Sequence, residues 1–134
     1  MKLITRDTDY AIRALCFIAR QKEKEKKVSV PDLVKELKIP RPFLRKILQI
    51  LNKKGILKSY KGLGGGFLLA GPPDKIFLLD LIGVFQGSLQ LNECIFKKKL
   101  CPNRAICALR HKILSIEKDV FLELKSITIA SLLN

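Results

Sequence analysis

Three of the four cysteines, Cys94, Cys101 and Cys107, lie close together, with six and then five residues between them. Thiolates bind soft or borderline metal ions and iron–sulfur clusters. Neither gap matches the Cys-x-x-Cys pairs of common zinc sites. From the spacing alone two interpretations stay open: a metal or cluster site, or thiols that are buried or that sense oxidants directly.

A site with three thiolates leaves a fourth ligand to be found, and the sequence offers several sources. His111 lies four residues after Cys107, so on a helix it would share the face of that cysteine. Asp9 or a residue of a second subunit could also supply the ligand. The remaining cysteine, Cys16, lies among apolar positions with helical spacing, and we expect it to be a small buried core residue.

The positive charge is concentrated in the first half of the chain. The formal net charge is +14, and residues 1–61 hold 17 basic and 6 acidic side chains while residues 62–134 hold 9 basic and 6 acidic ones. Such asymmetry indicates a polyanionic partner for the first half, with nucleic acid favoured over an anionic membrane surface. The alternative is that the charge serves only solubility.

Other function classes find little support in the sequence. His111 is the only histidine, and no nucleophile with a matched base is evident, so we do not expect an enzyme. Residues 1–20 contain no uncharged stretch typical of a secretory signal, and the longest apolar run, residues 76–85, is broken by Asp80 and too short to span a membrane. We therefore expect a cytoplasmic protein without disulfides or a membrane partner.

Helical spacing of apolar residues predicts three helices in the first half of the chain. The first covers about residues 7–21, and the second starts at Ser29, a good N-cap. The third covers about residues 41–53, between Pro40 and Gly55. Its predicted core face consists of Phe43, Leu44, Ile47, Leu48 and Leu51.

A glycine-rich hairpin follows, with strands at about residues 56–61 and 67–70 and a turn at residues 62–66. Helices are then expected at about residues 77–86 and 104–126. The last helix carries apolar residues at heptad spacing, which is suited to a partner helix, although packing on its own domain is the alternative. These residues are Ile106, Leu109, Ile113, Ile116 and Val120.

Two short helices joined by a tight turn and followed by a hairpin are the order of a winged helix-turn-helix. The expected fold is therefore mainly α with a small β-hairpin, a winged helix-turn-helix with a long C-terminal dimerisation helix. Residues 1–75 would form the DNA-binding region. Residues 76–134 would form the sensor loop and dimerisation helix of the same compact domain.

The predicted DNA-binding residues lie on the third helix and in the hairpin. Arg45 and Gln49 are suited to base edges in a major groove, and the other polar residues of that helix to phosphates. The hairpin offers cations beside a narrow glycine tip that could enter a minor groove, whereas a nucleotide-binding loop is disfavoured because a strand follows. A merely solvated face is the alternative. The full set is Arg41, Arg45, Lys46, Gln49, Asn52, Lys53, Lys58, Ser59, Lys61, Gly64 and Gly65.

Three strings of residues resemble a known family. They are Leu3-x5-Asp9-Tyr10-Ala11-x2-Ala14-Leu15, Ile39-Pro40-x2-Phe43-Leu44-x2-Ile47-Leu48 and Lys58-Ser59-x-Lys61-Gly62-x-Gly64-Gly65-Gly66-Phe67-x-Leu69-Ala70. Together with three cysteines before a long helix, they resemble the Rrf-two family of bacterial regulators, which includes IscR-like and NsrR-like members. The resemblance spans nearly the whole chain.

The resemblance implies a winged-helix homodimer that binds palindromic promoter DNA and dimerises through its last helix. It also implies that Cys94, Cys101 and Cys107 hold a [2Fe–2S] or [4Fe–4S] cluster. IscR-like members place a histidine ligand where this chain has Arg110, with His111 one residue later, and NsrR-like members use an acid at the position of Asp9 from the other subunit. Lys61 replaces the arginine usual in the wing of the family.

The expected function is therefore a DNA-binding transcriptional regulator, a repressor, whose DNA affinity is modulated by an iron–sulfur cluster. The cluster would sense redox state, nitric oxide or cluster supply. One alternative is a cluster-free repressor on the same scaffold that responds to thiol oxidation or to a ligand. Another is a metal-binding adaptor whose basic face meets an acidic protein partner.

Overall fold

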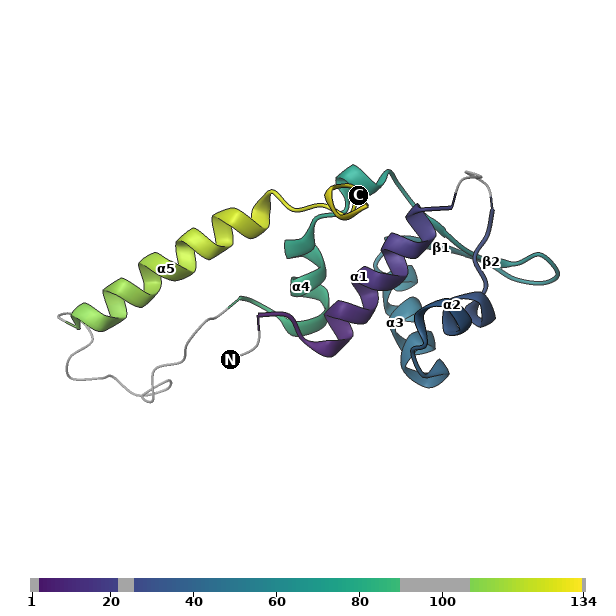
Figure 1. Ribbon diagram of the computed structural model, residues 1–134, viewed down its shortest axis with the longest axis horizontal. Helices are drawn as coiled ribbons and strands as arrows, with labels where there is room; N and C mark the ends of the chain where they lie inside the picture. The colour runs from purple at the N-terminus through teal and green to yellow at the C-terminus, as the bar shows by residue number, and fades with distance from the viewer. Residues whose placement is uncertain (1–2, 22–25, 90–106, 134) are drawn as a thin grey trace.

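The computed structural model describes residues 3–21, 26–89 and 107–133. Cys94 and Cys101 therefore lie outside the described residues. Figure 1 shows a helical body from which the hairpin and the longest helix project in opposite directions. The elements in chain order are α1 (Arg6–Ala19), α2 (Val30–Leu37), α3 (Arg41–Lys53), β1 (Leu57–Tyr60), β2 (Gly66–Leu69), η1 (Pro73–Lys75), α4 (Leu78–Gln86), α5 (Ala108–Lys125) and η2 (Ala130–Leu132).

Helix α1 lies at the centre of the body, where it contacts α2, α3, α4 and β2. Small side chains, Ala11 and Ala14, are fully buried and let neighbouring elements approach its axis closely. Cys16 is also buried on this helix, as the sequence predicted. The first turn is fixed by Gln86 of α4, whose Oε1 accepts hydrogen bonds from Thr5 N at 3.0 Å and from Thr8 Oγ1 at 2.7 Å.

Helix α2 begins as the sequence predicted, with Ser29 as its N-cap. Asp32 N donates to Ser29 Oγ at 3.2 Å and Ser29 N donates to Asp32 Oδ2 at 3.3 Å, which forms a reciprocal capping box. The helix ends at Lys38, whose φ of 55° is left-handed. The short turn that follows leads directly into α3 and completes the helix-turn-helix.

Helix α3 has the predicted bounds, but the assignment of one residue, Phe43, to its core face is wrong. Leu44, Ile47, Leu48 and Leu51 are buried, whereas 40% of Phe43 is exposed. Each helical residue turns by about 100°, so Phe43 falls at the edge of the buried stripe. The guanidinium of Arg6 covers its ring, 4.7 Å from the centroid.

The hairpin is confirmed, with a first strand shorter than predicted and a second strand of the predicted length that begins one residue earlier. β1 pairs antiparallel with β2 from Leu57↔Leu69 to Tyr60↔Gly66. Val28, just before α2, extends the sheet, because Val28 N donates to Phe67 O at 3.0 Å and Phe67 N donates to Val28 O at 2.8 Å. Strand β2 of the hairpin is thereby fixed to the segment that leads into α2.

Helix α5 begins at Ala108, later than the predicted start at residue 104, because Cys107 is its non-helical N-cap. It contacts α4 near its C-terminal end, where Leu124 packs with Leu78 and Ile82 in a second buried cluster. The other end of α5 extends away from the body (Figure 1). Within the described residues, no helix has the length and apolar character needed to cross a membrane.

The predicted heptad seam lies mostly on this projecting part of α5. Leu109 is 68% and Ile116 55% exposed, Ile113 and Val120 are half-buried, and Ile106 lies outside the described residues. Leu114, Phe121 and Leu122 are exposed as well. Packing on its own domain therefore accounts for only the C-terminal end of this helix.

Candidate functional site

Helix α3 presents a polar face away from the core. Its burial against α1 involves one stripe only, so the remaining positions of the helix face solvent. All six polar residues predicted to bind DNA are exposed: Arg41, Arg45, Lys46, Gln49, Asn52 and Lys53. Four of these side chains are cations, and no acidic residue lies in the helix.

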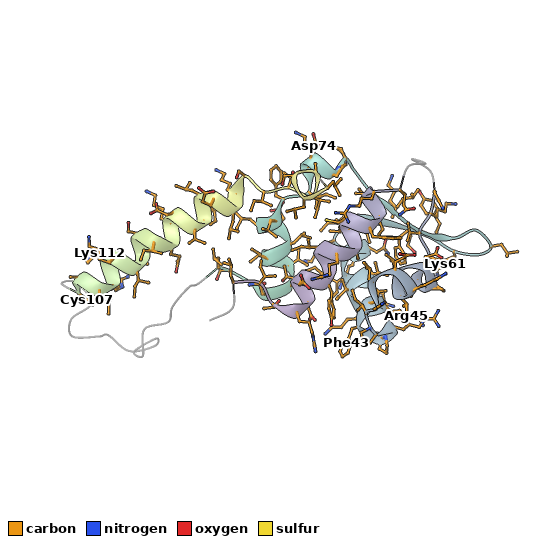
Figure 2. The ribbon with its side chains drawn as sticks, in the orientation of Figure 1. Phe43, Arg45, Lys61, Asp74, Cys107 and Lys112 are labelled. Atoms are coloured by element: carbon orange, nitrogen blue, oxygen red, sulfur yellow. The ribbon has the colours of Figure 1, made fainter. Side chains whose placement is uncertain are left out.

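The hairpin continues this basic surface. Lys58, Ser59 and Lys61 are exposed. Figure 2 shows Phe43, Arg45 and Lys61 along one end of the molecule, away from Cys107 at the far end of α5. We call the exposed polar residues of α3 together with residues 58–65 the reading head.

The electrostatics of the reading head are uniform. Residues 37–73 contain eight cations and no aspartate or glutamate. The ion pair found among the described residues is Arg13–Asp9, at 2.8 Å on α1. No described carboxylate neutralises the cations of the reading head, so this surface carries a continuous positive potential suited to a polyanion.

The tip of the hairpin depends on glycine. Gly64 has a φ of 72°, in the left-handed region. Gly65 N donates to Gly62 O at 2.9 Å to close the turn, and a Cβ on Gly65 would lie 2.4 Å from the carbonyl oxygen of Tyr60. The narrow shape of the tip therefore requires that Gly65 carry no side chain.

Sequence reasoning missed two cations beside the reading head, because they lie outside α3 and the hairpin. Arg6 of α1 lies over Phe43 of α3, and Lys27 lies over Tyr60 of β1 with Nζ 4.4 Å from the ring centroid. Phe43 and Tyr60 are each 40% exposed. No spacing rule links these pairs, since each joins residues more than thirty positions apart.

Among the predicted cluster ligands, Cys107 is described by the structure. It is a half-buried free thiol and the N-cap of α5, where Sγ accepts a hydrogen bond from Arg110 N at 3.4 Å. His111 N donates to Cys107 O at 3.2 Å, so the two residues lie one helical turn apart. The His111 side chain is exposed.

The two candidate fourth ligands lie in different parts of the chain. Asp9 lies on α1, where Oδ2 accepts a hydrogen bond from Arg13 Nε at 2.8 Å. Cys107 and α1 are well separated (Figure 2). Because of this separation, one subunit does not bring Asp9 to Cys107. In the described part of the chain, no three histidine, cysteine or acidic side chains come together.

Cys16 differs from Cys107 in its surroundings. Burial raises the pKa of the Cys16 thiol, and the positive charge of Arg20 partly opposes this effect. The thiol therefore stays protonated at neutral pH, and a protonated thiol is a poor metal ligand and nucleophile. Cys16 belongs to the core and serves as an internal control for the other cysteines.

Comparison with known proteins identifies relatives of the chain. A family model described as "Rrf2: Iron-dependent Transcriptional regulator" matches residues 4–134. The chain is 33% identical over 124 residues to the HTH-type transcriptional regulator NsrR of Bacillus licheniformis, covering 90% of this chain and 85% of that protein.

Two solved structures extend the comparison. The structure of CymR (YrzC), described as the Global Cysteine Regulator of B. subtilis, superposes with a TM-score of 0.82 at 25% identity, covering 99% of this chain and 97% of that one. T. potens IscR superposes with a TM-score of 0.74 at 26% identity, covering 99% and 86%. These neighbours confirm the predicted fold class.

The steric role of Gly65 leads to a testable difference between two glycines. In Gly65→Ala the new methyl group would meet backbone at Tyr60 and Gly62, so the tip must open. We expect the free energy of unfolding to fall by about 1–3 kcal/mol, measured by urea denaturation.

Gly71→Ala is the matched control, because its Cβ would meet open space. It should change the free energy of unfolding by less than about 0.5 kcal/mol. Equal effects of the two substitutions would contradict the assigned geometry of the tip.

Proposed function

The chain belongs to the Rrf2 family of transcriptional regulators, and from this premise we propose that it is a homodimeric repressor whose affinity for palindromic DNA depends on an iron–sulfur cluster. The observation that carries the DNA-binding part is the reading head, a surface of exposed cations free of carboxylates. Residues 1–75 form its DNA-binding region and residues 76–134 its sensor and dimerisation region.

The shape of the reading head suits two grooves at once. Helix α3 enters the major groove, where Arg45 and Gln49 donate to base edges and the remaining polar residues bind phosphates. The hairpin lies in the neighbouring minor groove, where Lys58, Ser59 and Lys61 bind the backbone. Gly64 and Gly65 let the main chain approach closely at the tip.

The exposed apolar side chains of α5 support a second copy of the chain as the partner. Large apolar side chains at this density are costly to leave in water. A two-fold dimer would cover them and place two reading heads at a fixed separation, which matches a palindromic operator. The exposed residues are Leu109, Leu114, Ile116, Phe121 and Leu122.

The environment of Cys107 fits a cluster ligand. The backbone N–H of Arg110 donates to Sγ at 3.4 Å, and hydrogen bonds to ligand sulfurs are a feature of protein-bound clusters. Cys94, Cys101 and Cys107 would hold a [2Fe–2S] or [4Fe–4S] cluster, which supplies redox and nitric oxide chemistry when bound. His111 lies one turn from Cys107, whereas Asp9 would have to come from the other subunit.

The chain offers a direct connection between the cysteine end of α5 and the reading head. After α5, Ile127 O accepts from Leu78 N at 3.0 Å and Ile129 N donates to Ile76 O at 2.9 Å. Residues 76–78 follow the hairpin and lead into α4, which fixes the start of α1. A tilt of α5 would therefore move both the hairpin and the start of α1. A free-energy difference of about 1–3 kcal/mol between two dimer states changes DNA affinity ~5–150-fold.

A second candidate function is supported by a specific likeness. The fold is shared over nearly the full chain with a protein described as a global cysteine regulator. On this alternative the chain is a repressor that holds no cluster and responds to a ligand or to oxidation of its thiols. A protein adaptor is less well supported, because the family consists of transcriptional regulators.

The DNA-binding role predicts distinct effects for two residues of the reading head. Arg45→Ala should weaken binding to a duplex selected from a random pool by about 1–3 kcal/mol, because the guanidinium that reads a base edge is removed. Lys61→Ala should weaken binding to all sequences and lower the salt dependence by about 0.9 in log–log slope for each phosphate that Lys61 neutralises. Fluorescence anisotropy at several salt concentrations measures both.

Lys75→Ala serves as the control, because Lys75 lies on η1, outside the reading head. Figure 2 shows its neighbour in the chain, Asp74, apart from Arg45 and Lys61. The affinity and slope of this variant should match those of the wild type. Unchanged affinity and slope in both Arg45→Ala and Lys61→Ala would exclude DNA binding through this surface.

If the three cysteines hold a cluster, a variant that lacks one of them should contain less iron than the wild-type protein. Anaerobically purified wild-type protein should contain iron, sulfide and visible absorbance, and Cys101→Ala should lose them because one thiolate ligand is removed. Cys16→Ala is the control and should keep its iron, since Cys16 is buried in the core. Iron-free wild-type protein that still binds DNA would favour the cluster-free alternative.

A further inference from the structure

We propose that Arg6 and Lys27, each held over an aromatic ring, bind DNA phosphates on the two sides of the base-reading residue Arg45. This inference rests on the proposed DNA-binding function and adds two phosphate-binding cations from outside the helix-turn-helix and hairpin. Phe43 and Tyr60 act as positioning residues for these cations. We call the pairs Arg6–Phe43 and Lys27–Tyr60 the two clasps.

The clasps lie on opposite sides of Arg45 in the reading head. Phe43 is in the first turn of α3, and Tyr60 ends β1 next to Lys61. In Figure 2, Arg45 lies between Phe43 and Lys61. A cation held at Phe43 and another held beside Lys61 therefore extend the basic surface on both sides of the base-reading residues.

Each clasp fixes a cation whose backbone is already anchored. Arg6 follows Thr5, whose N–H donates to Gln86 Oε1 at 3.0 Å, and α1 is held there by the buried Thr8. Lys27 precedes Val28, which is hydrogen-bonded to Phe67 of β2 in both directions. With the backbone fixed, the ring contact restricts the long side chain to one region of space.

Both side chains keep donors that can bind an anion. Among the described residues, no carboxylate forms an ion pair with Arg6 or Lys27. Stacking uses the face of the guanidinium or one side of the ammonium group, so N–H donors remain for phosphate oxygens. Restricting these rotamers before binding reduces the entropic cost of ordering them on the DNA.

The start of α1 has no net charge, so Arg6 adds positive charge to the reading head only if its side chain is directed toward α3. Asp7 and Asp9 offset Arg6 and Arg13 there. Asp9 is paired with Arg13, whereas Arg6 is drawn to Phe43 on α3. Phe43 thereby turns a locally neutral helix end into an addition to the reading head. This also explains why an aromatic residue is exposed at a position where the sequence predicts core.

The test measures DNA affinity and its salt dependence for the full chain, with a duplex that the wild-type protein selects from a random pool. Arg6→Gln and Lys27→Gln should each weaken binding roughly tenfold. Each should lower the log–log salt slope by about 0.9 per phosphate, thus by about 1.8 in a two-fold dimer. Lys75→Gln, which removes one charge away from the reading head, should leave the slope unchanged.

A double-mutant cycle tests the positioning role of the rings. Phe43→Leu should weaken DNA binding in the wild-type background and have no further effect once Arg6 is Gln. Phe43→Tyr keeps a ring and should restore the affinity. A purely structural role of Phe43 would instead lower the free energy of unfolding equally in both backgrounds and leave the salt slope unchanged.

Two results separate failure of this inference from failure of the proposed function. If Arg45→Ala weakens binding while Arg6→Gln and Lys27→Gln keep the wild-type slope, the clasps do not bind phosphate and the inference is wrong. If the pool yields no bound duplex, or if Arg45→Ala and Lys61→Ala both leave affinity and salt slope unchanged, the proposed DNA-binding function itself is wrong.

Discussion

The reading head depends on one interaction, the packing of an apolar stripe of α3 against α1. Leu44, Ile47, Leu48 and Leu51 are almost fully buried, and their burial fixes the rotation of α3 about its axis. Because the helix contains no acid, that single rotation turns every cation of α3 outward together. The hairpin is held in the same frame by its hydrogen bonds to Val28. Fold and electrostatics thus have one common cause.

The bounds of most helices and strands could be predicted from the sequence, because the residues that start and stop them act locally. Pro40 and Gly55 bound α3, Ser29 caps α2, and the glycines between two apolar runs define the hairpin. What it predicted wrongly or missed depends on contacts across the fold. Phe43 was assigned to the core because periodicity does not locate the edge of a buried stripe. The partners of Phe43 and Tyr60, Arg6 and Lys27, are set by tertiary packing, which residue spacing does not report. The roles assigned to the cysteines stay predictions, with Cys107 the member placed by the structure.

The part of the chain after the hairpin has two structural roles. The projecting α5 exposes large apolar side chains that a second copy could cover, and the segment after it returns to pair with residues 76–78. On the proposed function, a force applied to α5 at the Cys107 end would act on the elements that orient the reading head. Such an arrangement would let a local change at the thiols alter affinity at a distant surface without rebuilding the core.

The central claim is that the state of the Cys94, Cys101 and Cys107 thiols sets the strength of DNA binding by the reading head. It is tested most directly by measuring the dissociation constant for the selected duplex with one anaerobic preparation, before and after its iron is removed by a chelator. The account predicts a change of ~5–150-fold, with the dimer intact in both states. Equal dissociation constants for the iron-loaded and iron-free protein would contradict it.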